Sequence, residues 1–197
     1  MRVLLVVGSA PSLFDDLAAA QALYSDAEIM LVNGACAAVE AAQHVLAGHT
    51  DKAEEFARAR EEAFPFALPW RLHATQRIGS NPIRPEEYPS VTDWWGPDCT
   101  SGATSAGKAA LIGLRMGFDR IILVGCPLDG SGYFVGESAG IPQLRSCQRV
   151  GDPTKQQAAT IRRYKKRMAE LAETTFKGKV FSVSGYTREL LGFPPAP

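Results

Sequence analysis

Short apolar runs alternate with longer polar or amphipathic stretches along the chain. The runs are rich in Val, Leu and Ile, and the clearest lie at Arg2–Gly8 and Arg120–Gly125. Continuous apolar runs of this length are typical of strands that are buried on both faces of a sheet. We predict strands over Arg2–Gly8, Glu28–Asn33, His44–Gly48, Trp70–Thr75, Arg120–Gly125 and Lys179–Ser184.

The stretches between these runs predict helices. Ser12 can cap the first helix, and Gly117 is well placed to end the fourth. The helices are predicted over Ser12–Tyr24, Gly34–Gln43, Asp51–Ala63, Ala103–Met116, Thr154–Phe176 and Tyr186–Leu191. The proline-rich end at Phe193–Pro197 is expected to be a disordered tail or a surface strap. Alternating strands and helices predict an α/β fold, a three-layer, doubly wound, mainly parallel, Rossmann-like sheet of about six strands.

The length of 197 residues and the hydrophobic content of 46% suit one domain with a substantial core, spanning residues 1–197. Two long loops are expected within it, Gln76–Thr100 and the glycine-rich Cys126–Pro153. Loops of this length in a compact domain are often functional. Trp94 and Trp95 in the first loop are suited either to stacking on a base or sugar or to filling a core or subunit interface.

The balance of positive and negative charges argues against one class of function. Lys+Arg and Asp+Glu both number 21, which argues against general nucleic-acid binding. The basic residues of the long helix follow one another closely and point in several directions, so we predict a solvated surface without one compact patch. They are Arg162, Arg163, Lys165, Lys166 and Arg167. The alternative is that a subset of them helps to attract a nucleotide or a polyanionic acceptor.

The apolar run Val3–Val7 is too short for a membrane span, and the four cysteines show no zinc-binding spacing, so we expect a cytoplasmic protein with reduced thiols.

In a doubly wound sheet, ligands bind beyond the carboxyl ends of the strands. The segment Gly8-Ser9-Ala10-Pro11-Ser12 lies there, between the first strand and the first helix. A glycine lets the backbone approach a ligand, and a helix N-terminus offers N–H groups to an anion. We interpret the segment as a phosphate site, with a tight turn between strand and helix as the plainer alternative.

A second glycine-containing segment, Gly102–Lys108, is similar to a P-loop. Ala109 stands where the magnesium-binding Ser or Thr would be, and no strand is predicted directly before it. We therefore favour a helix cap at Thr100-Ser101-Gly102 that holds a second part of a charged ligand. A close-packed capped helix is the plainer alternative, and a kinase that uses Lys108 to bind magnesium-ATP is a third.

Three side chains are candidates for general acid–base chemistry. His49 and Asp51 follow the third predicted strand, and Asp129 follows the fifth. Asp129 in a glycine-rich loop is alternatively a turn residue. His44 is expected inside its strand, and His73 is either catalytic or structural.

Two stretches resemble the signatures of a group of Rossmann-like proteins. Gly8-Ser9-Ala10-Pro11-Ser12-Leu13 resembles a G-x-G-P-S-L opening after the first strand. The second resemblance runs from Thr100-Ser101-Gly102 through a helix ending in Gly117-Phe118 to a strand ending at Gly125. The group includes bacterial CMP-sialic-acid sialyltransferases and DUF115-like proteins, among them 6-hydroxymethylpterin diphosphokinases of the archaeal kind. The chain is similar in length to compact members encoded in phages or prophages.

The resemblance implies a cytidine-nucleotide site. In the sialyltransferases, the first glycine loop and an asparagine after the second strand hold the nucleotide. Those roles fall here on Gly8, Ser9, Pro11, Ser12 and Asn33. The Ser-Gly cap falls on Ser101 and Gly102, and Ser184 is similar to a position near the donor phosphate.

Together these features predict an enzyme that binds a nucleotide or nucleotide sugar at the carboxyl edge of the sheet. The reaction would be group transfer to an acceptor held by the long loops, as in a glycosyltransferase of the sialyltransferase kind. One alternative is a non-catalytic nucleotide-binding, sensing or assembly protein. The resemblance favours it in one respect, because the sialyltransferases carry a catalytic histidine late in the chain and no histidine follows His73 here. Another is a pterin diphosphokinase-like phosphotransferase. The sequence specifies neither a cofactor nor a metal ligand, and it leaves the acceptor and a homo-oligomer open.

Overall fold

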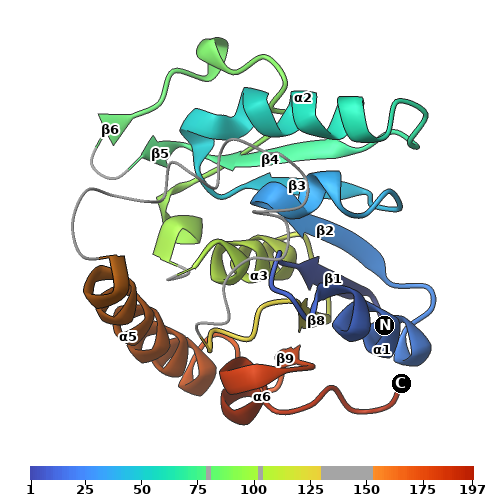
Figure 1. The fold of residues 1–197 in the computed structure, drawn as a ribbon, viewed down its shortest axis with the longest axis vertical. Coiled ribbons are helices and arrows are strands. Elements are labelled where there is room, and N and C mark those ends of the chain that lie inside the picture. Colours follow the sequence, from blue (N-terminus) through green and yellow to red (C-terminus); the bar gives the residue numbers. More distant parts are fainter. Residues whose placement is uncertain (79–80, 102–103, 130–152) are drawn as a thin grey trace.

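A seven-stranded sheet organises the computed structural model, which describes residues 1–78, 81–101, 104–129 and 153–197 (Figure 1). The strand order is β7-β4-β3-β2-β1-β8-β9, and every pairing is parallel. The predicted doubly wound α/β fold is therefore confirmed, with one strand more than expected. The strands are β1 Val3–Val7, β2 Glu28–Val32, β3 His44–Ala47, β4 Arg71–Thr75, β7 Asp93–Trp95, β8 Arg120–Val124 and β9 Val180–Ser182.

Helices cover both faces of the sheet. Residues of α1 (Leu13–Leu23) and α2 (Ala53–Ala63) belong to the core on one face, and residues of α3 (Ser105–Arg115) and α5 (Pro153–Glu173) to the core on the other. The short α6 (Gly185–Leu191) lies against β9 and α5. Smaller elements are the 3₁₀ turns η1 Asn33–Ala37, η2 Thr50–Lys52, η3 Pro85–Glu87 and η4 Pro97–Ser101, and the ladder of β5 Arg77–Ile78 with β6 Asn81–Pro82.

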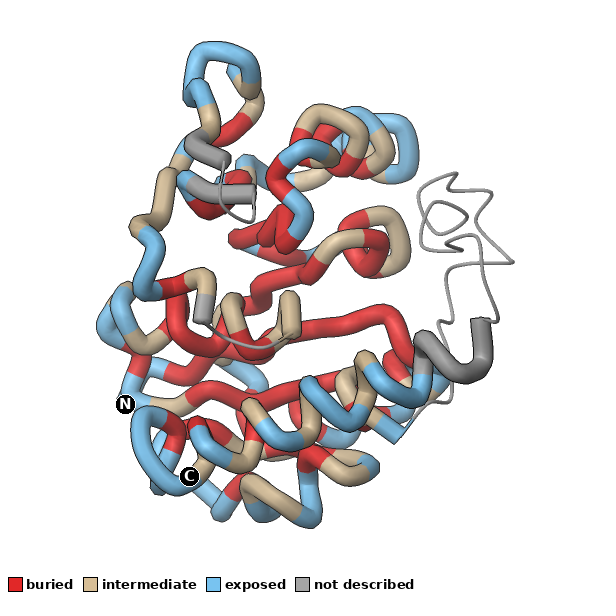
Figure 2. Tube along the Cα trace, turned by 90° about the vertical axis from the view of Figure 1, so that its left-hand side faces the viewer, coloured by how far each residue is buried: buried red, intermediate tan, exposed pale blue. Residues whose placement is uncertain are grey.

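The apolar runs are continuous because both faces of the central strands are covered. In β1, Leu5 and Val7 pack in the core beneath α1, whereas Leu4 and Val6 pack in the core beneath α3. Figure 2 shows the resulting band of buried strands through the middle of the molecule. Successive side chains of a strand point to opposite faces, so a strand buried on both sides has no polar alternation.

Two sequence predictions about local structure are wrong. The segment Gln76–Thr100 is not irregular throughout, because β7 pairs there with β4 and forms one edge of the sheet. The segment Gly34–Gln43 is not an α-helix, since only the 3₁₀ turn η1 forms there. The long loop predicted over Cys126–Pro153 lies mostly outside the described residues.

Helix α3 crosses the middle of the sheet and contacts β8, β1, β2 and β3. It approaches closely at Gly113, where a Cβ atom would stand 2.6 Å from Leu4 Cδ2 and 2.7 Å from Ile121 Cδ1. The close-packed helix offered by the sequence is thus present. Its cap is Thr104, whose side chain accepts a hydrogen bond from Gly107 N at 2.9 Å, and not the predicted Thr100-Ser101-Gly102, of which Gly102 lies outside the described residues.

The strand order reverses between β1 and β8. From β1 the chain moves outward through β2, β3, β4 and β7, and it then returns through α3 to β8 on the other side of β1. Open α/β sheets bind ligands at the carboxyl ends of strands beside such a reversal. Because α3 runs from the end of β7 back toward the start of β8, its first turn also lies at this edge.

The C-terminal segment folds back over the sheet as a strap. Ser182 N of β9 donates a hydrogen bond to Gly192 O at 3.0 Å, and Pro194 is buried. Tyr24 of the α1 region donates its hydroxyl to Pro195 O and accepts from Arg120 Nη1. Of the two expectations for this end, the surface strap is confirmed. Among the described residues, no helix is both long and apolar enough to cross a membrane.

Candidate functional site

The ends of β2 and β3 and the first turn of α3 form one polar cluster at the carboxyl edge. Asn33 adopts a left-handed backbone conformation (φ 52°), and its Oδ1 accepts a hydrogen bond from Gly48 N at 2.8 Å. Lys108 Nζ donates to Gly48 O at 2.9 Å. A Cβ atom on Gly48 would stand 2.3 Å from Ser105 Oγ, so only glycine lets α3 come this close. We call Asn33, Gly48, His49, Ser105 and Lys108 the strand-edge cluster.

The strand-edge cluster is cationic and partly desolvated. Burial lowers the pKa of the Lys108 ammonium from its usual value. Burial also lowers the pKa of His49, the positive charge of Lys108 lowers it further, and Asp51 opposes both. His49 is therefore mostly neutral at pH 7 and able to accept a proton, next to an ammonium that attracts anions.

A second cluster joins β1, β8 and β9 through one buried carboxylate. Asp16 on α1 is 7% exposed. Its Oδ2 accepts hydrogen bonds from Gly125 N at 2.9 Å, Ser12 Oγ at 3.0 Å and Ser184 Oγ at 2.5 Å. Asp16 thus holds the turns after three strands in fixed relative positions at the reversal of strand order.

Gly8 and Gly125 make the closest approach in this second cluster. Gly8 N donates to Val124 O at 2.8 Å, and Ala10 N donates to Gly125 O at 3.1 Å. Beside them the Cys126 thiol donates to Val124 O, and burial raises the pKa of that thiol to about 12, so it stays protonated. The glycine at position 8 is required for packing between these turns, which is the plainer of the two readings of this segment.

We predict that Gly8→Ala destabilises the fold by about 1–3 kcal/mol, as overpacking typically does. A Cβ atom at this position would stand 2.5 Å from Cys126 Sγ and 2.6 Å from Gly125 O, and the latter is backbone that cannot easily move. Urea unfolding measures the loss. The control is Gly96→Ala, where the Cβ atom meets only the Asp98 carboxylate at 3.1 Å. An equal loss in both variants would contradict the packing argument.

The remaining predicted nucleotide-binding residues have different outcomes. Ser9 is buried and Pro11 is exposed, and Ser12 and Ser184 are engaged by Asp16. Ser101 ends η4, but its side chain and all of Gly102 lie outside the described residues. Their roles toward a nucleotide stay predictions.

The three predicted catalytic residues come from the ends of two different strands. His49 and Asp51 are neighbours near Lys108, and both keep exposed surface, although the surrounding atoms partly desolvate the His49 ring. Asp129 is exposed beyond β8, and β1 and β2 lie between the ends of β3 and β8. Three strand spacings amount to about 14 Å. Among the described residues, no three His, Cys, Asp or Glu side chains are arranged to hold a metal ion.

His73 is part of a buried hydrogen-bonded relay. Trp95 Nε1 donates to His73 Nδ1 at 3.1 Å, so the proton of His73 resides on Nε2. That nitrogen lies 3.0 Å from His44 Nδ1, and His44 Nε2 lies 3.1 Å from Glu28 Oε2. The direction of donation is therefore Trp95 to His73 to His44 to Glu28. His73 is 1% exposed, which supports the structural alternative for this residue, and His44 lies inside β3 as expected.

The sequence reasoning did not assign Lys108 or Asp16 to the site. The sequence suggests a role for Lys108 only as a P-loop lysine, because the strand before its helix, β7, has no apolar run that would predict it. Asp16 lies in the first predicted helix, where nothing in the sequence distinguishes it from its neighbour Asp15. Its partners Gly125 and Ser184 are 109 and 168 residues away, so the local sequence contains no signal for its role.

Comparison with protein-family models, with curated proteins and with solved structures found no match to this chain. The resemblance to sialyltransferase-like and DUF115-like proteins is therefore supported only at the level of an α/β fold with a seven-stranded parallel sheet.

Proposed function

We propose that this chain binds a nucleotide or nucleotide sugar at the strand-edge cluster and transfers a group from it to an acceptor. The observation that carries the proposal is the partly buried Lys108 ammonium, held at the carboxyl edge beside His49. A desolvated ammonium next to a helix N-terminus is suited to phosphate oxygens. The position beyond the strand ends is where α/β sheets place nucleotides.

Each residue of the cluster has a separate role in the proposed reaction. Lys108 would neutralise the phosphate, and as a fixed cation it would also stabilise negative charge on a leaving phosphate. His49 would accept a proton from the acceptor hydroxyl, since its lowered pKa keeps it neutral at pH 7. Asp51 lies near His49 and favours the imidazolium that this transfer forms. Asn33 positions the Gly48 peptide to which Lys108 is bonded.

We expect Lys108→Met to weaken nucleotide binding by about tenfold, which corresponds to about 1.4 kcal/mol for one charged contact. The measurement is a thermal-shift series with CMP, CDP, UDP, GDP, ATP and a pterin, each with and without magnesium. A ligand at about 100 times its dissociation constant adds about 2.7 kcal/mol of stability, a shift of several degrees. The variant should lose about half of that shift.

The control for this experiment is Lys177→Met, which removes one exposed lysine far along the chain from the cluster. It should bind the nucleotide as the wild type does. The proposal is wrong if none of the nucleotides stabilises the wild type. It is also wrong if a nucleotide raises the melting temperatures of Lys108→Met and Lys177→Met by the same amount. A metal-independent shift with CMP favours sialyl-like transfer, whereas a magnesium-dependent shift with ATP or the pterin favours diphosphoryl transfer.

A non-catalytic nucleotide-binding protein is the second candidate. It is favoured because His49 and Asp129 follow two strands that β1 and β2 separate, so the predicted acid and base come from different parts of the carboxyl edge. Donor hydrolysis by the wild type and by His49→Gln separates the two candidates. An enzyme loses turnover in the variant with little change in affinity, and a binding protein shows no turnover in either.

A further inference from the structure

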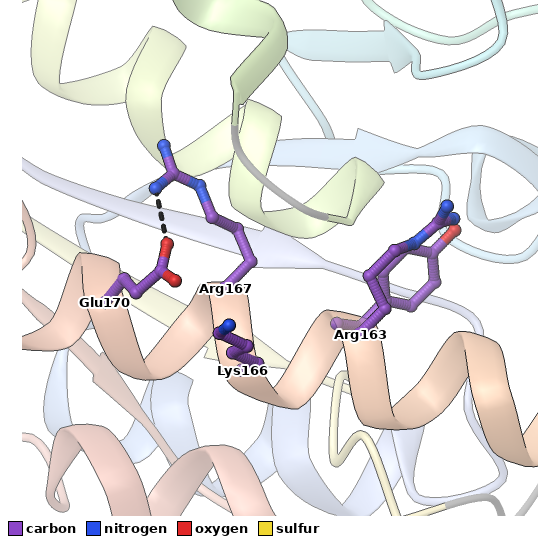
Figure 3. A pocket seen from close by; sticks show the side chains of 5 residues that line it. Arg163, Lys166, Arg167 and Glu170 are labelled. Carbon is purple, nitrogen blue, oxygen red and sulfur yellow. Dashed lines mark hydrogen bonds and ion pairs between the residues drawn. The ribbon is translucent and has the colours of Figure 1, made fainter.

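One face of α5 gathers positive charge around a hollow. Arg163, Lys166, Arg167 and Glu170 are spaced so that they share one side of the helix. With Tyr164 they line a cavity of about 460 Å³, which we call the α5 hollow (Figure 3). Of the five basic residues of this helix, Arg163, Lys166 and Arg167 line the hollow, and Arg162 and Lys165 do not.

The charges of the α5 hollow are unbalanced. Glu170 Oε2 accepts a hydrogen bond from Arg167 Nη1 at 2.7 Å, so among the described residues that line the hollow, the one carboxylate is engaged by one of three cations. Arg163 and Lys166 are exposed, and the Arg163 guanidinium lies 5.5 Å from the centroid of the Tyr164 ring. The chain as a whole is formally neutral, so this excess of two positive charges is a local feature.

The hollow is separate from the packing surfaces of the helix. Met168 and Leu171 are buried in the core beneath α5. The Lys165 ammonium points to another side, 4.2 Å from the centroid of the Tyr186 ring on α6. Neither core packing nor the contact with α6 therefore requires Arg163 or Lys166 to be cationic.

The hollow also lies on the same side of the sheet as the helix that carries Lys108. Residues of α3 and α5 pack in one core on this face, and in Figure 3 Arg163 and Arg167 extend from α5 on the side of α3. A ligand held at the first turn of α3 and a second one held along α5 would thus occupy one face of the molecule.

We propose that the α5 hollow binds the anionic part of the second substrate, an acceptor that carries phosphate or carboxylate groups. The inference rests on the proposed function, which requires an acceptor. Guanidinium groups pair with the two oxygens of such anions through parallel hydrogen bonds. Arg163 lies about one helical turn from Lys166 and Arg167, which matches anionic groups about 5–6 Å apart.

Calorimetric titration with inorganic pyrophosphate and, separately, with citrate tests the proposal. The titrations use the Lys108→Met protein, so that binding at the strand-edge cluster is already weakened about tenfold. We expect Arg163→Gln/Lys166→Gln, added to that protein, to weaken binding of at least one probe tenfold or more. Weaker binding of pyrophosphate indicates an acceptor that carries phosphate groups. Weaker binding of citrate indicates an acceptor that carries carboxylate groups.

Arg58→Gln/Arg162→Gln is the charge-matched control, because it removes two exposed arginines that do not line the hollow. It should change the affinity for either probe by less than twofold. Equal weakening in both double variants, or no binding of either probe to the Lys108→Met protein, overturns the proposal. The nucleotide shift of the wild type is measured separately, so failure of the hollow leaves the proposed function intact.

Discussion

Arg60→Ala is expected to lower the free energy of unfolding by about 3–5 kcal/mol, because it removes three hydrogen bonds from a charged donor and leaves a cavity where a large side chain was buried. Arg60 on α2 has no exposed surface. Its guanidinium donates to three carbonyl oxygens, those of Cys36 at 3.0 Å, Val39 at 3.0 Å and Glu40 at 2.7 Å. Truncation leaves buried carbonyls without a donor, and each such group costs about 1–3 kcal/mol.

Aromatic contacts add to the loss. The guanidinium carbon of Arg60 lies 5.7 Å from the ring centroid of Phe64 and 5.4 Å from that of Trp70. Arg60→Lys keeps the charge but not the planar fork, so we expect an intermediate loss.

Urea unfolding of the Arg60 variants measures both effects. Arg58→Ala, an exposed position on the same helix, is the matched control and should stay within about 0.5 kcal/mol of the wild type. A loss below about 1 kcal/mol in Arg60→Ala would show that other contacts hold the segment after β2.

Acidification from pH 7 to pH 4 is expected to destabilise the fold by about 3 kcal/mol through His73 alone. Burial lowers the pKa of His73 from 6.5 to about 4. Asp93 opposes this shift, whereas His44 and Arg71 add to it. Between the two pKa values the unfolded chain binds a proton that the folded chain does not, so stability is complete above pH 6.5 and falls as the pH approaches 4. Each pKa unit corresponds to about 1.36 kcal/mol.

The buried relay explains why His73 resists protonation. Its Nδ1 accepts from Trp95, so a second proton on the ring would remove that acceptor. A proton added at Nδ1 would instead need an acceptor, and the Asp93 Oδ2 atom is 3.7 Å away.

Unfolding free energies at several pH values test the role of His73. In His73→Asn the slope between pH 6.5 and 4 should flatten, whatever the absolute stability of the variant. In His49→Gln, which replaces an exposed histidine, most of the slope should remain. An unchanged slope in His73→Asn would assign the acid sensitivity to other groups.

The strand pattern was predictable because the central strands are apolar on both faces, but β7 was not. Its three residues follow a proline-rich stretch and have no apolar run of their own. The strand is fixed by tertiary hydrogen bonds instead, from Thr92 N to Leu72 O and from Gln76 N to Trp95 O, both at 2.9 Å.

The segment after β2 shows tertiary structure overriding helix propensity. Alanine favours a helix there, but Asn33 turns the chain into the left-handed region. Arg60 then binds the carbonyls of Cys36, Val39 and Glu40, which in an α-helix would accept backbone amides.

The candidate site was predictable only where a residue directly follows a strand. This rule placed Asn33 and His49 at the carboxyl edge, and the structure brings both to the strand-edge cluster. Lys108 arrives from a helix that crosses four strands, so its meeting with Gly48, 60 residues away, depends on the topology of the whole sheet.

The strap at the C-terminal end has a consequence for how copies of this chain meet. An edge strand normally exposes amides that can pair with a strand of another molecule and start aggregation. β9 is only three residues long, and the outward amide of Ser182 is already bonded to Gly192 O. With Pro194 buried beside it, this edge offers little template for strand addition, so the strap acts as a guard against edge-to-edge association.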